Sequence, residues 1–236
     1  MALYFRQLLA GRDFARSDEV AAQMRNFVYA IGDTETRQCV LVDPAWDIDG
    51  LLAVLDRDDM QLAGVLATHY HPDHIGGSMF GFTVEGLPTL LAKRPVPVHV
   101  HTEESHGART VTGLAATDFV GHHGGDTLDV GKVRIQLLHT PGHTPGSQCF
   151  LVGGRLVAGD TLFVQGCGRV DLPGGNAEEM HRTLTQRLAT LPDDTILYPG
   201  HDYADRPTST LRDERRDNVY MRMSGLDDWR RLMGAP

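Results

Sequence analysis

The sequence has few cysteines, few lysines and no long apolar run, and each shortage disfavours a class of protein. Its three cysteines, Cys39, Cys149 and Cys167, are far apart and odd in number, which fits a reducing compartment better than a disulfide framework. They form no Cys-x-x-Cys pair, so a cysteine-based zinc site is disfavoured. No stretch approaches the roughly 20 apolar residues of a membrane-spanning helix, and the opening residues lack the apolar core of a signal peptide. We therefore expect a cytoplasmic protein with no membrane partner.

The charge balance is acidic, with a formal net charge of -9 and only two lysines in 236 residues. Proteins that bind nucleic acid usually carry clustered positive charge, so we expect a small-molecule substrate and no nucleic-acid partner. A hydrophobic fraction of 41% with 22% charged residues is ordinary for a globular protein with a packed core. At this length we expect one domain over residues 1–236, with a short helical C-terminal extension, as a monomer or homodimer.

Apolar periodicity and turn residues predict both strands and helices along the chain. β-Forming residues around a Gly-Asp turn predict a hairpin over residues 24–44. Helical spacing, with Asp47 and Asn176 as starting residues, predicts helices at 47–55 and 178–191. A short helix is predicted at 87–93, and strands at 62–67, 96–100, 127–130, 133–138, 148–152, 155–158 and 195–198. Runs of strands interrupted by single helices indicate two packed sheets with helices on their outer faces.

The most informative segment places His69, His71, Asp73 and His74 directly after the strand at 62–67. Four side chains that bind metals thus share one loop between a strand and a helix, where an irregular backbone lets them converge. Neutral imidazoles and carboxylates are ligands that suit zinc and related divalent ions. This loop therefore predicts a metal site.

Three later residues have the same character: His143, Asp160 and His201 each follow a predicted strand and lie beside a glycine. Because each comes after a strand end, we expect them at the same edge of the sheets as the first loop. A lone histidine in a loop is more often solvated or hydrogen-bonded than a metal ligand. We interpret seven histidines in that way: His99, His101, His106, His122, His123, His139 and His181.

The order His-x-His-x-Asp-His, followed by Gly-His, Gly-Asp and a further Gly-His, resembles the metallo-β-lactamase superfamily. Residues 159–163, 166–169 and 191–195 are similar to glyoxalase II and its relatives. The resemblance implies an α/β fold of the αβ/βα four-layer sandwich type, in which two mixed β-sheets are flanked by helices and the metals lie at one end. Carried over by motif, a first divalent ion would be held by His69, His71 and His143, and a second by Asp73, His74 and His201, with Asp160 bridging them.

The same resemblance assigns further roles. Zinc is the expected ion at both positions, with iron or manganese as alternatives. Asp73 and Asp160 would be the catalytic carboxylates. Asp160 would bridge the ions, and Asp73 would also orient the nucleophile or accept its proton. Asp43, at the end of an earlier strand, would either hold an imidazole of the site or form a strand-end turn with Pro44.

Three enzyme classes share this ligand set and remain open from the sequence. A glyoxalase II-like hydrolase would use two metal ions to activate water against a thioester such as an acylglutathione, and this is our prediction. A persulfide dioxygenase would use one iron ion, held by His69, His143 and Asp160, to add oxygen to glutathione persulfide. A lactonase or another ester or amide hydrolase is the third class, because site chemistry on this fold is shared across substrates.

Two segments near the ligands bear on the substrate. Just after Gly-Cys-Gly, glyoxalase II has a Lys and a Tyr that contact glutathione, whereas this chain has Arg169, Val170 and Asp171. Arg169 and Tyr203 are the candidate substrate-binding residues, and an arginine can pair with a substrate carboxylate through two hydrogen bonds. The apolar residues of segment 78–97 form either a wall beside the metals or part of the core.

Overall fold

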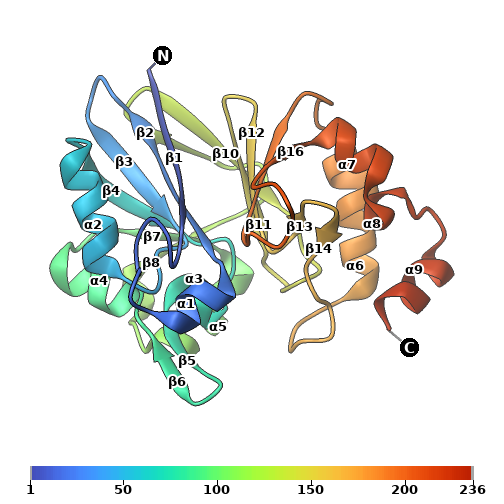
Figure 1. The fold of residues 1–236 in the computed structure, drawn as a ribbon, viewed down its shortest axis with the longest axis horizontal. Helices are drawn as coiled ribbons and strands as arrows, with labels where there is room; N and C mark the ends of the chain where they lie inside the picture. The colour runs from blue at the N-terminus through green and yellow to red at the C-terminus, as the bar shows by residue number, and fades with distance from the viewer. Residues whose placement is uncertain (1, 235–236) are drawn as a thin grey trace.

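Two β-sheets pack face to face, and helices cover both outer faces (Figure 1). The computed structural model describes residues 2–234 of the chain. One apolar cluster lies between the sheets and includes Phe27, Ile31, Ile135 and Phe150. Two further clusters lie between each sheet and its own helices. This arrangement confirms the αβ/βα four-layer sandwich, because each sheet buries both of its faces.

The first sheet has the strand order β1-β2-β3-β4-β7-β8. Its strands are β1 (Leu3–Leu9), β2 (Phe27–Asp33), β3 (Gln38–Val42), β4 (Gln61–Leu66), β7 (Val98–His101) and β8 (Phe119–His122). The predicted hairpin is the antiparallel pair β2 and β3, whereas β3, β4, β7 and β8 pair in parallel. The carboxyl ends of β3 and β4 therefore meet at one edge of the sheet.

The second sheet has the strand order β16-β15-β12-β11-β10-β9. Its strands are β9 (Thr127–Val130), β10 (Val133–His139), β11 (Gln148–Val152), β12 (Arg155–Gly159), β15 (Ile196–Pro199) and β16 (Ser209–Thr210). Strands β12 and β15 are parallel, and β10 runs antiparallel to β11. Because β11 runs antiparallel to β12 as well, β10, β12 and β15 all end at the same edge.

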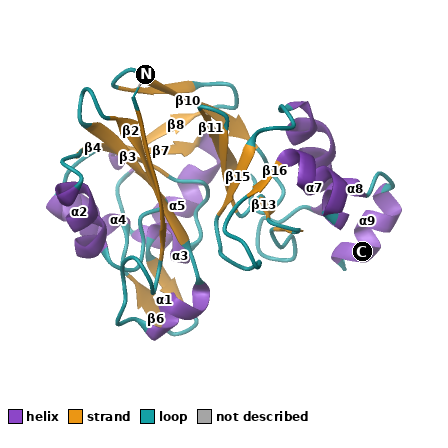
Figure 2. Cartoon of the chain, turned by 45° about the horizontal axis from the view of Figure 1, so that its top comes forward, coloured by secondary structure: helices purple, strands orange, loops and turns teal. Residues whose placement is uncertain are grey.

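The helices lie on the two outer sides of the sheets, as the turned view in Figure 2 shows. On the side of the first sheet they are α1 (Glu19–Met24), α2 (Ile48–Arg57), α3 (Pro72–Ile75), α4 (Leu87–Lys93) and α5 (Ser105–Thr112). On the side of the second sheet they are α6 (Ala177–Arg182), α7 (Leu211–Asp217), α8 (Val219–Arg222) and α9 (Leu226–Met233). Asp47 and Asn176 cap α2 and α6 by accepting main-chain N–H groups, as predicted. Among residues 2–234, no helix is long and apolar enough to cross a membrane.

The single α-helix predicted at 178–191 is wrong in its second half. The α-helical turns of α6 end at Arg182, and residues 183–187 and 188–190 continue as a π-turn and a 3₁₀-turn. Side chains compete there for main-chain carbonyls: Thr185 donates to the His181 oxygen, and the Arg215 guanidinium donates to the oxygens of Leu188 and Leu191. Such contacts offer the backbone alternatives to the regular ladder.

Segment 78–97 forms no continuous apolar wall. Its first part is a hairpin of β5 (Gly77–Met79) and β6 (Phe82–Val84), and Phe80 at the tip is 87% exposed. Leu87 is fully buried in the core beside the first sheet. The Phe82 ring packs 6.3 Å from the Trp46 ring, measured between ring centroids. The apolar residues of this segment are thus divided between the core and the surface.

Candidate metal centre

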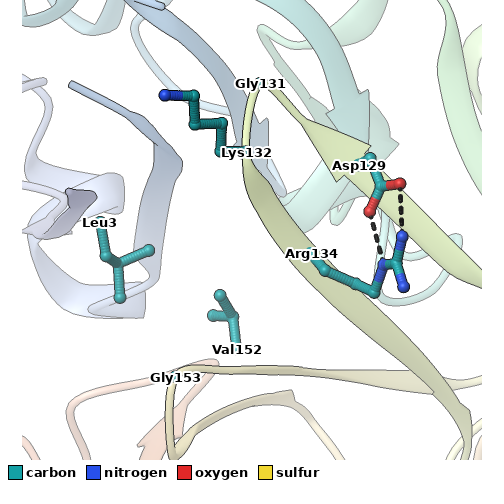
Figure 3. A pocket seen from close by; sticks show the side chains of 7 residues that line it. All are labelled: Leu3, Asp129, Gly131, Lys132, Arg134, Val152 and Gly153. Atoms are coloured by element: carbon teal, nitrogen blue, oxygen red, sulfur yellow. Dashed lines mark hydrogen bonds and ion pairs between the residues drawn. The ribbon is translucent and has the colours of Figure 1, made fainter. Parts of the chain in front are cut away.

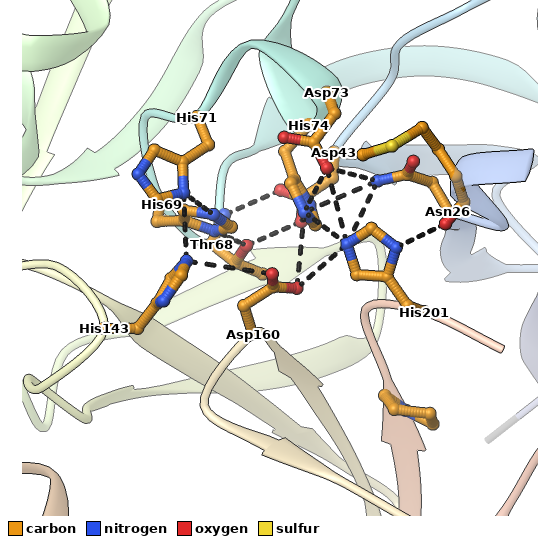
Figure 4. Close-up of polar contacts among 12 residues, drawn as sticks. Asn26, Asp43, Thr68, His69, His71, Asp73, His74, His143, Asp160 and His201 are labelled. Carbon is orange, nitrogen blue, oxygen red and sulfur yellow. Dashed lines mark hydrogen bonds and ion pairs between the residues drawn. The ribbon is translucent and has the colours of Figure 1, made fainter. Parts of the chain in front are cut away.

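The seven predicted ligand residues meet at the edge where β4, β10, β12 and β15 end (Figure 4). The β4 strand leads into the loop with His69 and His71, and Pro72 starts the short helix α3, which carries Asp73 and His74. Proline suits the first position of a helix because its φ is already helical and it needs no N–H partner there. The backbone therefore turns sharply after the strand, and four side chains point to one place.

The first group consists of three imidazoles. His71 Nδ1 lies 3.0 Å from His69 Nε2 and 2.9 Å from His143 Nε2. Burial lowers the pKa of His69 well below its usual value and lowers that of His71 to about 4. Burial also lowers the pKa of His143. All three rings are consequently neutral at pH 7 and offer lone pairs to a cation.

The second group brings four possible ligand atoms close together. His74 Nε2 and His201 Nε2 are 3.2 Å apart. Asp73 Oδ2 and Asp160 Oδ1 each lie 3.3 Å from the His74 nitrogen and 3.4 Å from the His201 nitrogen. A tetrahedron of N and O ligands drawn about 2.0–2.1 Å from zinc has edges of about 3.3–3.4 Å. These five separations are those of ligand atoms that share one zinc ion, so the four side chains can hold a divalent ion.

Asp160 connects the two groups. Its Oδ1 faces the second group, and its Oδ2 lies 3.7 Å from His143 Nε2 in the first. Among the described residues Oδ1 finds no hydrogen-bond partner, although it is buried. The imidazoles of His74 and His201, 3.3 and 3.4 Å away, offset its buried charge, and a bound metal ion would take over that role.

The outer nitrogens of three of these histidines are hydrogen-bonded to the surrounding protein. His143 Nδ1 donates to the Arg169 main-chain oxygen at 2.7 Å, and His201 Nδ1 donates to the Met24 oxygen at 2.8 Å. His74 Nδ1 donates to Asp43 Oδ2 at 2.9 Å. These contacts leave the inner nitrogens to face the centre, as in metal sites where a second hydrogen bond fixes the ligand ring.

Asp43 holds two of these rings. It accepts the Thr68 main-chain N–H at 2.7 Å and the Thr68 hydroxyl at 2.6 Å, besides the proton of His74 Nδ1. Because the Thr68 hydroxyl proton goes to Asp43, Thr68 Oγ1 accepts the Nδ1 proton of His69 at 2.9 Å. Asp43 thus holds imidazoles of both groups. It also has a φ of 54°, so the strand-end turn and the supporting role coexist in one residue.

The carboxylates give the second group a different charge from the first. Burial favours the neutral imidazole, but Asp73 and Asp160 outweigh it and hold the pKa of His74 well above its usual value. The same balance, with Asp160 the largest favourable contribution, raises the pKa of His201 to about 9. Burial opposes ionisation of both carboxyls, yet the surrounding imidazoles keep their pKa values well below the usual range. A cation entering this group would replace protons.

Two glycines permit the loops to close around Asp160. A Cβ atom at Gly200 would lie 2.3 Å from Asp160 Oδ1, and one at Gly168 would lie 1.8 Å from the Asp160 main-chain oxygen. Both contacts are closer than real Cβ atoms allow. Glycine is therefore required at positions 168 and 200 by the close approach of two chain segments.

The candidate substrate-binding residues lie beside the centre in different ways. Tyr203 stacks on the His201 ring at 4.6 Å between centroids, with 10° between the planes, and is 58% exposed. Phe163 lies 5.5 Å from the Tyr203 ring. The Arg169 guanidinium makes an exposed pair with Asp171, while its main-chain oxygen holds His143. The structure thus brings the Tyr203 ring to the ligands, but only the backbone of Arg169.

Glu104 contributes to the centre without any signal in the sequence. This residue is 1% exposed, and its carboxylate accepts the Tyr70 N–H at 2.8 Å, the Gly146 N–H at 2.7 Å and the Thr144 hydroxyl at 2.8 Å. It therefore joins the loop of His69 and His71 to the loop of His143. Its neighbour Glu103 is exposed. Two adjacent glutamates in a polar run cannot be told apart without the fold.

Other clusters lack the features of this centre. His101, Glu103 and His139 also lie within reach of one ion, but the two rings are stacked at 3.9 Å with 9° between their planes. Imidazole lone pairs lie in the ring plane, so these two do not converge. A hollow of about 410 Å³ lies at the far ends of the strands, beside the turns at Gly131 and Gly153 (Figure 3). The exposed pair of Asp129 and Arg134 borders it, and no predicted ligand does.

The family model of the metallo-β-lactamase superfamily matches residues 24–201, the span that carries all of these ligands. The chain belongs to the metallo-β-lactamase superfamily. Within that superfamily, the crystal structure of ETHE1 from Myxococcus xanthus is similar, with a TM-score of 0.79 and 32% sequence identity over 98% of this chain and 90% of that one.

Relatives in the superfamily differ in activity. Human mitochondrial persulfide dioxygenase ETHE1 is 29% identical, over 88% of this chain and 76% of its own length. A probable hydroxyacylglutathione hydrolase of Schizosaccharomyces pombe is 36% identical, over 75% of this chain and 64% of its own length. Membership of the superfamily therefore does not by itself determine the reaction.

Proposed function

We propose that this protein is a dinuclear metal-dependent hydrolase whose substrate is a thioester such as an acylglutathione. The observation that carries the proposal is the second group, in which Asp73 Oδ2 and Asp160 Oδ1 each lie 3.3–3.4 Å from the inner nitrogens of His74 and His201, beside the three imidazoles of the first group. A pair of filled metal positions is what a hydrolase of this kind needs. Zinc suits the imidazole and carboxylate donors, and iron and manganese suit them as well.

Bound at this centre, two divalent ions would lower the pKa of a water molecule and polarise the substrate carbonyl. The water oxygen then bonds to the acyl carbon, the carbon–sulfur bond breaks, and the products are a carboxylic acid and a thiol. Asp160 would keep the two positions together through its two oxygens. Asp73 stays ionised at neutral pH because its pKa lies well below the usual value, so it can orient the attacking water or accept its proton.

Three residues near the centre, Phe163, Arg169 and Tyr203, would contact the rest of the substrate. Burial and the nearby carboxylates raise the pKa of Tyr203 to about 12, so its phenol remains a hydrogen-bond donor. The stacked Tyr203 ring and Phe163 would contact the apolar part of an acyl or thiol group. Arg169 would bind a substrate carboxylate by exchanging its partner Asp171, because exposed ion pairs are weak.

The second candidate is a persulfide dioxygenase with a single iron ion held by His69, His143 and Asp160. It is favoured by the similarity to human ETHE1 over 88% of this chain. The two candidates differ in metal count and in the second substrate, since only the dioxygenase consumes oxygen. Lactones and other esters remain a further substrate class for a dinuclear hydrolase.

One experiment separates these functions. Protein purified without added metal is analysed for its elements and then assayed in parallel on S-lactoylglutathione, on a lactone panel, and on glutathione persulfide with an oxygen electrode. The proposal expects about two metal equivalents and thioester cleavage that is lost in Asp160→Ala. One equivalent of iron, together with oxygen consumption on the persulfide and no thioester cleavage, would replace it with the dioxygenase.

A further inference from the structure

Asn26 is a buried asparagine beside the second metal group. Its residue exposure is 1%, and it lies just before β2, where its main chain forms an antiparallel bridge with His201. The next residue, Phe27, donates its N–H to the Gly200 oxygen at 2.7 Å, and Ala10 donates to the Asn26 oxygen at 3.0 Å. The backbone of Asn26 is thereby fixed against the loop that carries His201.

The side-chain amide of Asn26 faces three of the four ligand atoms (Figure 4). Its Nδ2 donates to Asp73 Oδ2 at 3.0 Å, and the same nitrogen is 3.4 Å from His74 Nε2 and 3.5 Å from His201 Nε2. The fourth atom, Asp160 Oδ1, has no hydrogen-bond partner among the described residues, so the amide is not bonded to it. The Asn26 amide therefore lies against the ligand atoms of Asp73, His74 and His201.

The orientation of this amide is fixed by Trp46. The indole Nε1 donates to Asn26 Oδ1 at 3.1 Å and to the Asp73 main-chain oxygen at 3.1 Å. An indole N–H can only donate, so it selects the amide oxygen and turns the NH₂ group toward the ligands. An amide NH₂ donates hydrogen bonds and does not act as a metal ligand. Trp46 itself has a φ of 78°, a strained conformation of the kind that persists where the surroundings demand it.

We propose that Asn26 is a positioning residue of the second metal group, which orients the Asp73 carboxylate toward the ion. The inference rests on the metal centre of the proposed function. One lone pair of Asp73 Oδ2 is used by the amide, which leaves the other directed at the ion.

The test is a metal titration of the full chain without any substrate. Zinc is added in competition with a chromophoric chelator, and the dissociation constants of the first and second equivalents are fitted for wild type and Asn26→Leu. Loss of a partner that orients a ligand typically weakens metal binding by about 10- to 100-fold. We expect that loss at the second equivalent alone. A second equivalent bound as tightly by Asn26→Leu as by wild type overturns the inference.

Two further variants guard against a general loss of structure. Trp46→Phe keeps the Asn26 amide but removes the N–H that orients it, so it should also weaken binding of the second zinc ion. If Asn26→Leu does not fold, unchanged binding of the second ion in Trp46→Phe overturns the inference. Asn218→Ala is the matched control, because Asn218 is also buried but bonds to Glu214 and the Gly166 oxygen. If this control weakens binding of the second ion equally, general loosening of the fold explains the effect and the inference is overturned.

This experiment can fail separately from the proposed function. A chain that binds both ions normally in wild type, loses one in Asn26→Leu and cleaves no thioester would refute the proposed substrate and keep the role of Asn26. If wild type cleaves thioesters and Asn26→Leu binds the second ion normally, the role of Asn26 is refuted and the proposed substrate is kept.

Discussion

Replacement of Glu104 by glutamine should change how the stability of the protein depends on pH. Burial outweighs the three hydrogen bonds that the carboxylate accepts and raises its pKa from 4.5 to about 7. Between these values the folded protein holds a proton at Glu104 that the unfolded chain has lost. The stability that this site contributes is therefore complete below pH 4.5 and is lost as the pH rises through about 7.

The magnitude follows from the pKa. Each pH unit between the folded and unfolded values is worth about 1.4 kcal/mol, so the full change is about 3 kcal/mol. The Gln variant cannot titrate at this position and serves as the reference. We expect the free energy of unfolding of wild type, minus that of Glu104→Gln, to fall by about 3 kcal/mol between pH 4.5 and 8.

The assay is urea unfolding of both proteins in chelator across this pH range, because the subtraction removes the titrations that they share. Glutamine also places an NH₂ group against one of two main-chain N–H donors, those of Tyr70 and Gly146. That mismatch costs about 1–3 kcal/mol but does not vary with pH. A difference that stays constant, or that grows as the pH rises, would show that the hydrogen bonds dominate and that the burial argument is wrong.

Three other substitutions test the centre. Asp160→Ala should lower thioester hydrolysis by at least about 100-fold with an unchanged circular dichroism spectrum, and preserved turnover would remove the bridging role. Gly200→Ala should weaken metal binding by about 10-fold or more in a chelator competition, because its Cβ would lie 2.3 Å from Asp160 Oδ1. Gly225→Ala is the control, because the nearest atom to its Cβ would be 3.4 Å away. Tyr203→Ala should raise KM more than it lowers kcat. Because the ring stacks, Tyr203→Phe should restore most of the wild-type KM. Equal kinetics in wild type and both variants would exclude the ring from substrate binding.

The ligand residues could be found in the sequence because their placement is local. A buried strand followed at once by a turn directs the next side chains to the strand end, and glycine beside His143, Asp160 and His201 marks where the chain turns closely. The order of strands and helices likewise follows from periodicity, since each element has to bury one face. The αβ/βα sandwich and the convergence of the ligands at one edge were therefore predictable.

The remaining parts of the centre depend on contacts between distant segments. Asn26 reaches Asp73 across 47 positions, and Glu104 joins residues 34 and 42 positions away. No local spacing distinguishes Glu104 from the exposed Glu103. Strand β8 was not predicted either, because its residues show little apolar alternation. Arg169 was predicted to bind substrate through its side chain, whereas its main-chain oxygen is the group that contacts the metal-ligand candidate His143.

The sequence by itself determined which side chains can bind metal and at which edge of the sheets they gather, because strand ends and turns are set by neighbouring residues. Only the tertiary structure decided which atoms of those side chains face one another. The hydrogen bonds that Asp43 accepts and Asn26 donates fix the orientations of a ligand ring and a ligand carboxylate, and the bonds that Glu104 accepts join two ligand loops. All of them link segments that are distant in the sequence, so they exist only after the chain has folded.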